Sequence, residues 1–147
     1  MGEPFFVTPE VAPPALNVVG ENITVLARGE RTGSYEVFLQ SGAEGVGPPF
    51  HSHPWDEAYF VIEGVLRVTI GDKTHDLTPG GFAHIPAGSY HKFVGVGGPA
   101  RFVSITSQPG AARFFADLDR EVPTVPPDLP ALLAVFGRHR VEVQPPA

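Results

Sequence analysis

Four side chains that could bind one metal ion stand in the middle of the chain. His51 and His53 flank a single serine, Glu57 follows a short Pro-Trp-Asp turn, and His91 comes after a second proline-glycine turn. Residues two apart in an extended segment face the same side, so His51 and His53 point the same way. The proline turn returns the chain and brings the Glu57 carboxylate beside them. Imidazoles with one carboxylate suit Fe, Mn, Ni, Co, Cu or Zn as a divalent transition metal.

The segments that must position these ligands are predicted to be short β-strands. The chain has 147 residues with 17 glycines and 17 prolines, which break helices and separate apolar runs. Many short strands between turn signals indicate an all-β sandwich or barrel. The predicted strands are 23–27, 34–40, 57–63, 65–70, 73–77, 82–86, 91–95 and 101–107.

The pattern changes from strand to helix near Pro109. Residues 110–122 are predicted to be helical, and 129–140 are predicted to contain a second helix. We therefore expect one domain in three segments: an N-terminal arm at 1–22, a β-barrel at 23–108, and a C-terminal helical segment at 109–147 packed on the barrel.

The spacing of the candidate ligands resembles that of the cupin family. The first cupin motif is a glycine, five residues, His-x-His, three or four residues, Glu, six residues, and Gly. It matches Gly45, His51, His53, Glu57 and Gly64. The second motif matches Gly80, Pro86, Gly88 and His91, whereas Gly95 stands where the family has a structural asparagine.

This resemblance implies a fold, a site and an activity. The fold would be a single cupin jelly-roll β-barrel with C-terminal helices, and the metal ligands would be His51, His53, Glu57 and His91. The chain is similar to small single-domain cupins of the quercetin-2,3-dioxygenase type. Such a protein would be a metal-dependent dioxygenase that uses dioxygen on an aromatic or enolisable small molecule. Glu57 would be the catalytic base that deprotonates the bound enol or phenol. A homodimer is also expected from the family.

Two other classes of function stay open, because one fold hosts many reactions. A non-oxidative cupin isomerase, decarboxylase or lyase would use the metal as a Lewis acid and would work without oxygen. A non-catalytic cupin would bind a small ligand without turnover.

The substrate pocket is predicted to be mainly apolar and aromatic. Few basic residues lie near the motifs, so a phosphorylated substrate fits poorly. The candidate pocket residues are Tyr35, Phe38, Phe50, Trp55, Tyr59, His84, Phe93, Phe102 and Phe114.

Composition excludes several other kinds of partner. The formal net charge is −6 with only 10 Lys and Arg, which argues against a nucleic-acid partner. No apolar run is long enough to span a bilayer, so no membrane partner is expected. The chain has no cysteine and no basic-apolar leader, and we expect it in the cytoplasm.

Overall fold

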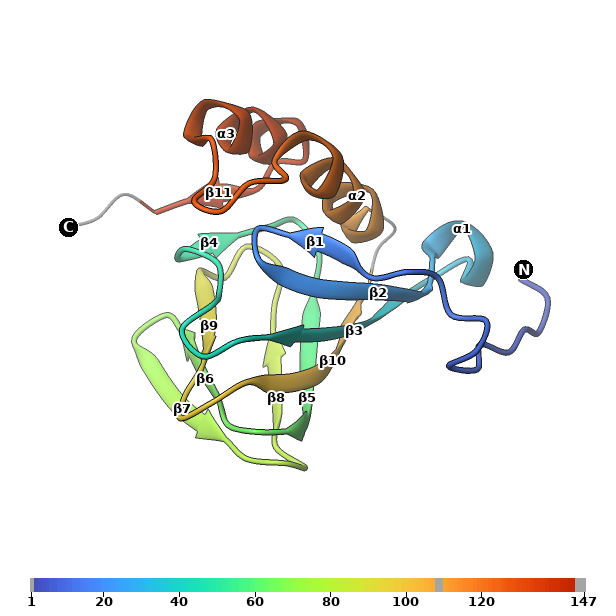
Figure 1. Cartoon of the computed structure of the whole chain (residues 1–147), viewed down its shortest axis with the longest axis horizontal. Helices are drawn as coiled ribbons and strands as arrows, with labels where there is room; N and C mark the ends of the chain where they lie inside the picture. The colour runs from blue at the N-terminus through green and yellow to red at the C-terminus, as the bar shows by residue number, and fades with distance from the viewer. Residues whose placement is uncertain (1, 108–109, 145–147) are drawn as a thin grey trace.

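Two antiparallel sheets form the body of the molecule (Figure 1). The computed structural model describes residues 2–107 and 110–144. The larger sheet follows the order β1 (Leu16–Val18), β2 (Glu21–Ala27), β3 (Glu36–Gly42), β10 (Ala100–Thr106), β5 (Glu57–Glu63) and β8 (Phe82–Ile85). The smaller sheet follows the order β11 (Glu142–Val143), β4 (His51–Ser52), β9 (His91–Gly95), β6 (Leu66–Ile70) and β7 (Lys73–Leu77).

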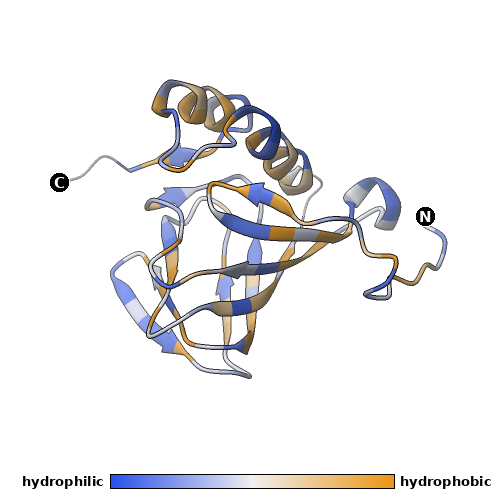
Figure 2. Cartoon of the chain, viewed as in Figure 1, coloured by the Kyte–Doolittle hydropathy of each residue, from blue (hydrophilic) through white to orange (hydrophobic). Residues whose placement is uncertain are grey.

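Alternating burial along the strands of the larger sheet turns one face toward the smaller sheet. In β5, Glu57, Tyr59 and Val61 are buried, whereas Phe60 between them is 47% exposed. Figure 2 shows hydrophobic and hydrophilic segments mixed along the strands, as this alternation requires. Edge-to-face contacts at ring-centroid distances of 5.1–5.4 Å join three of the aromatic rings between the sheets: Tyr59, Phe93 and Phe102.

Helices cover one end of the two sheets. α2 (Ala111–Glu121) and α3 (Leu129–Arg138) lie over the end where β1 and β4 are found, and the single-turn α1 (Gly29–Thr32) links β2 to β3 (Figure 1). The apolar face of α2 packs on the larger sheet, with Phe115 edge-on to Phe38 at 5.0 Å. This packing forms a second apolar cluster, separate from the one between the sheets.

The structure confirms the predicted all-β class with C-terminal helices, and it corrects several details. β1 lies within the segment expected to be an arm, and β11 follows the last helix. Among the described residues, ladders of hydrogen bonds do not join the two sheets into a closed barrel. The predicted boundary at 108/109 lies outside the described residues, as does the end of the chain at 145–147. None of the helices in the described part of the chain has the length and hydrophobicity to cross a bilayer.

Candidate metal centre

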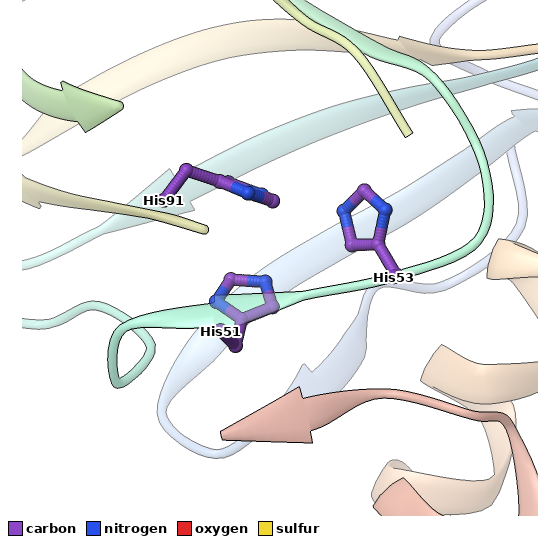
Figure 3. Close-up of side chains that lie close together, drawn as sticks. All are labelled: His51, His53 and His91. Atoms are coloured by element: carbon purple, nitrogen blue, oxygen red, sulfur yellow. The ribbon is translucent and has the colours of Figure 1, made fainter. Parts of the chain in front are cut away.

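Three buried imidazoles meet between β4 and β9. His51 pairs directly with His91 across these strands, and His53 lies just beyond the end of β4. Figure 3 shows His91 reaching toward the other two histidines from the neighbouring strand. The three side chains each offer one ligand nitrogen, and these nitrogens lie within 4.8 Å of one another. Three buried histidines at this spacing could hold a metal ion.

A backbone carbonyl fixes the tautomer of each imidazole. His51 Nδ1 donates to the Pro49 carbonyl at 2.8 Å, and His91 Nδ1 donates to the Ser89 carbonyl at 2.8 Å. His53 Nδ1 donates to the Trp55 carbonyl at 2.9 Å. A carbonyl only accepts hydrogen bonds, so each Nδ1 carries a proton, and in the neutral imidazole each Nε2 keeps a lone pair. Metal-binding histidines are commonly oriented in this way.

Glu57 adds a carboxylate to the three nitrogens. Its Oε1 atom lies 3.3 Å from His53 Nε2 and 3.4 Å from His91 Nε2. When His53 and His91 are neutral, these contacts place the lone pairs of their Nε2 atoms against the Glu57 carboxylate. These groups repel each other unless a cation lies between them. His91 Nε2 is buried and has no hydrogen-bond partner among the described residues. The donor set therefore fits a divalent transition metal.

The pKa values of two of these groups are shifted. Burial and the neighbouring His91 lower the pKa of His51 to about 4, so its imidazole stays neutral near pH 7. Burial by itself would raise the pKa of Glu57, but in the protonated state of His53 and His91 their hydrogen bonds and charge outweigh burial and hold that pKa well below its usual range. Neutral imidazoles and an ionised carboxylate are the protonation states that bind a metal.

Tyr59 supports the carboxylate from the same strand. Its hydroxyl donates to Glu57 Oε1 at 2.8 Å, and the side chain is only 1% exposed. Burial and the adjacent Glu57 carboxylate raise the pKa of Tyr59 well above its ordinary value. The phenol therefore stays protonated and remains a hydrogen-bond donor to Glu57.

The candidate metal centre opens on a small cavity of about 100 Å³ beneath α2 and α3. His51, His53 and Glu57 line one part of it, and the rest is lined mainly by apolar side chains of β1, β2 and the two helices. Four of the predicted pocket residues are in this wall: Trp55, Tyr59, Phe93 and Phe114. Trp55 stacks on His53 with ring centroids 4.5 Å apart, so it also holds that imidazole in place.

Two of the other predicted pocket residues are exposed. Tyr35 is 47% exposed and borders a separate hollow next to the N-terminal segment. His84 is exposed because the alternation of β8 buries Ile85 and turns His84 outward. The residue pattern of that strand does not indicate which set of alternate side chains is buried.

The remaining three predicted pocket residues pack against other aromatic rings and are not among the residues that line the cavity. Phe38 is fully buried against Phe115, and Phe102 is buried between the sheets. Phe50 is half-buried with its ring 5.8 Å from that of Tyr90. Their aromatic character satisfies packing and does not indicate contact with a ligand.

Sequence reasoning missed two polar residues of the cavity wall, Glu21 and Gln40. Gln40 Nε2 donates to Ser104 Oγ at 2.6 Å, but the Glu21 carboxyl lacks such a partner for its buried oxygen among the described residues. Glu21 lies two residues before Ile23, on the buried face of β2. A predicted strand that began at residue 21 and not at residue 23 would have placed the Glu21 carboxyl on the buried face of the sheet.

Comparison with known proteins supports the fold. Residues 38–106 match the model of the family described as "Cupin domain". The quercetin 2,3-dioxygenase of Bacillus subtilis is 34% identical over 95 residues, which cover 63% of this chain but only 28% of that protein. The chain thus corresponds to a small part of that relative.

Solved structures show the same fold at low identity. An RmlC-like cupin from Shewanella frigidimarina superimposes with a TM-score of 0.66 at 18% identity, covering 76% of this chain and 96% of that one. The polyketide cyclase RemF from Streptomyces resistomycificus gives a TM-score of 0.60 at 20% identity, covering 71% and 80%. The family match over residues 38–106 and these superpositions lead to one conclusion: the chain has the cupin fold, and its central segment matches the cupin family model.

Proposed function

We propose that this cupin is a metal-dependent dioxygenase acting on a small enolisable molecule, such as a hydroxyketone or a phenol. One observation carries the proposal. Three imidazoles with their Nε2 lone pairs free converge with a carboxylate at the wall of an apolar cavity. The similarity to a quercetin 2,3-dioxygenase, whose name states an oxidation by dioxygen, supports this class of reaction over others.

His51, His53, His91 and Glu57 would hold the ion, which is one of Fe, Mn, Ni, Co, Cu or Zn. When bound, a divalent metal supplies positive charge that lowers the pKa of a coordinated hydroxyl and fixes the orientation of the reactants. The backbone carbonyls behind the three imidazoles keep the ligand atoms directed at one point whether or not the ion is present.

Glu57 is the base of the proposed reaction. Its carboxylate takes the proton of the substrate hydroxyl, and Tyr59 orients it through the hydrogen bond at Oε1. The apolar walls exclude water from the resulting enolate, which strengthens its interaction with nearby charges. Both atoms of dioxygen then enter the product, so no outside reductant is required.

The size of the cavity favours a small substrate. Its volume of about 100 Å³ is well below the roughly 300–1,000 Å³ of sites for drug-sized ligands. A single-ring hydroxyketone suits this space better than a three-ring flavonol. A homodimer and a cytoplasmic location remain predictions from the sequence.

Metal analysis combined with oxygen uptake tests the proposal. Purified protein should contain about one transition metal per chain, and it should consume one dioxygen per molecule of a hydroxyketone or flavonol. His91→Ala should lower metal affinity at least about 100-fold and abolish oxygen uptake while the fold persists. His75→Ala, a change at an exposed histidine on β7, is the matched control and should behave like wild type.

Three outcomes would contradict the proposal. Full metal occupancy in His91→Ala would remove that residue from the ligand set. Turnover under strict anaerobiosis would identify a non-oxidative isomerase, decarboxylase or lyase. Binding of the compounds without any turnover, in the presence of oxygen and each metal, would identify a binding protein.

A further inference from the structure

Glu21 is a buried carboxyl in the cavity wall that the proposed chemistry does not use. It is the first residue of β2, its side chain is 6% exposed, and it lines the same cavity as His51 and Glu57. β2 is separated from β5, the strand of Glu57, by β3 and β10. The two carboxyls therefore reach the cavity from different parts of its wall.

The Glu21 carboxyl lacks the partners that a buried acid normally has. Its Oε2 atom is buried and has no hydrogen-bond partner among the described residues. Burial raises its pKa to about 7, with no neighbouring cation to offset the effect. An unpaired buried polar group destabilises a fold, so its presence in a ligand cavity points to a role in binding.

The neighbouring strand makes room for this carboxyl. Gly42 lies beside it, and a Cβ atom at that position would stand only 2.7 Å from Glu21 Oε1. The φ angle of Gly42 is not in the left-handed region, so the backbone there does not itself require glycine. Glycine at position 42 therefore leaves room for the Glu21 carboxyl.

We propose that Glu21 is a specificity-determining residue that hydrogen-bonds a hydroxyl group of the substrate, at a position away from the atoms that meet the histidines. The inference rests on the proposed function and narrows its substrate class to small hydroxyketones that carry a second, non-chelating hydroxyl. A carboxyl group can accept from such a hydroxyl in either protonation state, and it can also donate to it when protonated. The apolar surroundings make this single polar contact decisive, because a ligand without the hydroxyl leaves the carboxyl unpaired.

Two hydroxypyranones that differ by one oxygen atom test the assignment. Kojic acid and allomaltol share the same chelating hydroxyketone, but kojic acid has a hydroxymethyl group where allomaltol has methyl. Calorimetric titration of the Zn²⁺-loaded protein measures both affinities without turnover, because Zn²⁺ has no redox chemistry. Wild-type protein should bind kojic acid at least about 10-fold more tightly than allomaltol.

Variants at Glu21 should change this ratio and little else. In Glu21→Met the preference should fall to about onefold, whereas Glu21→Gln should keep most of it because an amide still accepts and donates. Leu118→Met, a volume-conserving change in another cavity residue, is the matched control and should alter both affinities alike. Zn²⁺ content should be the same in all four proteins.

Thermal stability separates a binding role from a structural one. In the metal-free protein, Glu21→Met should raise the Tm, because it removes an unpaired buried carboxyl; a structural glutamate would give the opposite change. An unchanged kojic acid preference in Glu21→Met, or equal binding of the two probes by wild type, would overturn the inference and leave the proposed function intact. If neither probe binds wild type, the proposed hydroxyketone site itself fails, and the inference fails with it.

Discussion

Two glutamates are buried in the same sheet, and their surroundings differ sharply. Glu36 begins β3 at the junction with the helices and is 1% exposed. Its two oxygens accept three backbone N–H groups: Gly29 at 2.9 Å, Gly110 at 3.1 Å and Ala112 at 3.0 Å. Glu21, in the cavity, has a buried oxygen with no such partner among the described residues.

The contrast shows what a buried carboxyl can be used for. Gly110, at the N-terminus of α2, has no side-chain oxygen to cap the helix, and Glu36 supplies that cap from the sheet. Glu36 therefore stabilises the attachment of α2 to the strands. In the described part of the chain the buried oxygen of Glu21 makes no such hydrogen bond, so this carboxyl remains available to a ligand.

The largest expected effect is at the structural carboxyl. Glu36→Ala leaves three backbone N–H groups without their acceptor, so it should lower the free energy of unfolding by about 3–5 kcal/mol. Urea denaturation followed by circular dichroism measures this change. A loss below about 1 kcal/mol would show that water replaces the Glu36 carboxylate as the acceptor of these N–H groups. It would contradict the structural role that distinguishes Glu36 from Glu21.

An intermediate effect is expected from the titration of Glu21. Its pKa is about 7 in the folded protein and ordinary, near 4.5, when unfolded. The folded state therefore binds the Glu21 proton more tightly than the unfolded state does. The contribution of this protonated carboxyl to the free energy of unfolding is fully present below about pH 4.5 and is lost as the pH rises through about 7. Relative to Glu21→Gln, which does not titrate there, wild type should lose about 2–3 kcal/mol of stability across this range.

Urea unfolding of both proteins between pH 4.5 and 8 checks this prediction. The difference between wild type and Glu21→Gln should level off above about pH 7.5. A difference that is constant with pH would show that Glu21 finds a partner, and it would place this residue in the same category as Glu36.

The smallest effect is expected at a carboxylate that caps a helix in solvent. Asp128 Oδ1 accepts from the Ala131 N–H at 3.2 Å at the start of α3. Asp128→Ala should lower the free energy of unfolding by only about 1 kcal/mol, because water can satisfy the exposed N–H. Thermal denaturation of Asp128→Ala and of Glu36→Ala measures how much burial increases the stability that a helix cap contributes. Equal losses of stability in the two variants would contradict this explanation.

The sequence was sufficient for the fold class and for the grouping of the candidate ligands. The His-x-His spacing and the following turn predicted that His51, His53 and Glu57 would lie together, and the structure brings His91 to them across β4 and β9. The grouping of His51, His53 and Glu57 depends on local geometry, namely strand alternation and tight turns, whereas the place of His91 beside them was implied by the resemblance to the cupin motifs.

Other predictions were less accurate. Leu16–Val18 was expected to be part of an arm, but it pairs with β2 through a two-residue turn at Val19 and Gly20 and packs beside α2. His84 was placed in the pocket, but a half-exposed strand of four residues can bury either set of alternate side chains. Glu21 was missed because a charged residue at the end of a strand is normally exposed, whereas this one is buried.

The pairing of β11 with β4 bears on how the protein is made. Val143, in the last strand along the described chain, lies opposite His51, and the Gln144 N–H donates to the Phe50 carbonyl at 3.0 Å. On the ribosome, the edge of the strand that carries His51 therefore stays uncovered until translation has passed both helices. The other strands can form earlier, whereas the pairing of β11 with β4 forms last. A metal ion bound by the nascent chain would therefore be bound before β11 covers the edge of the strand that carries His51.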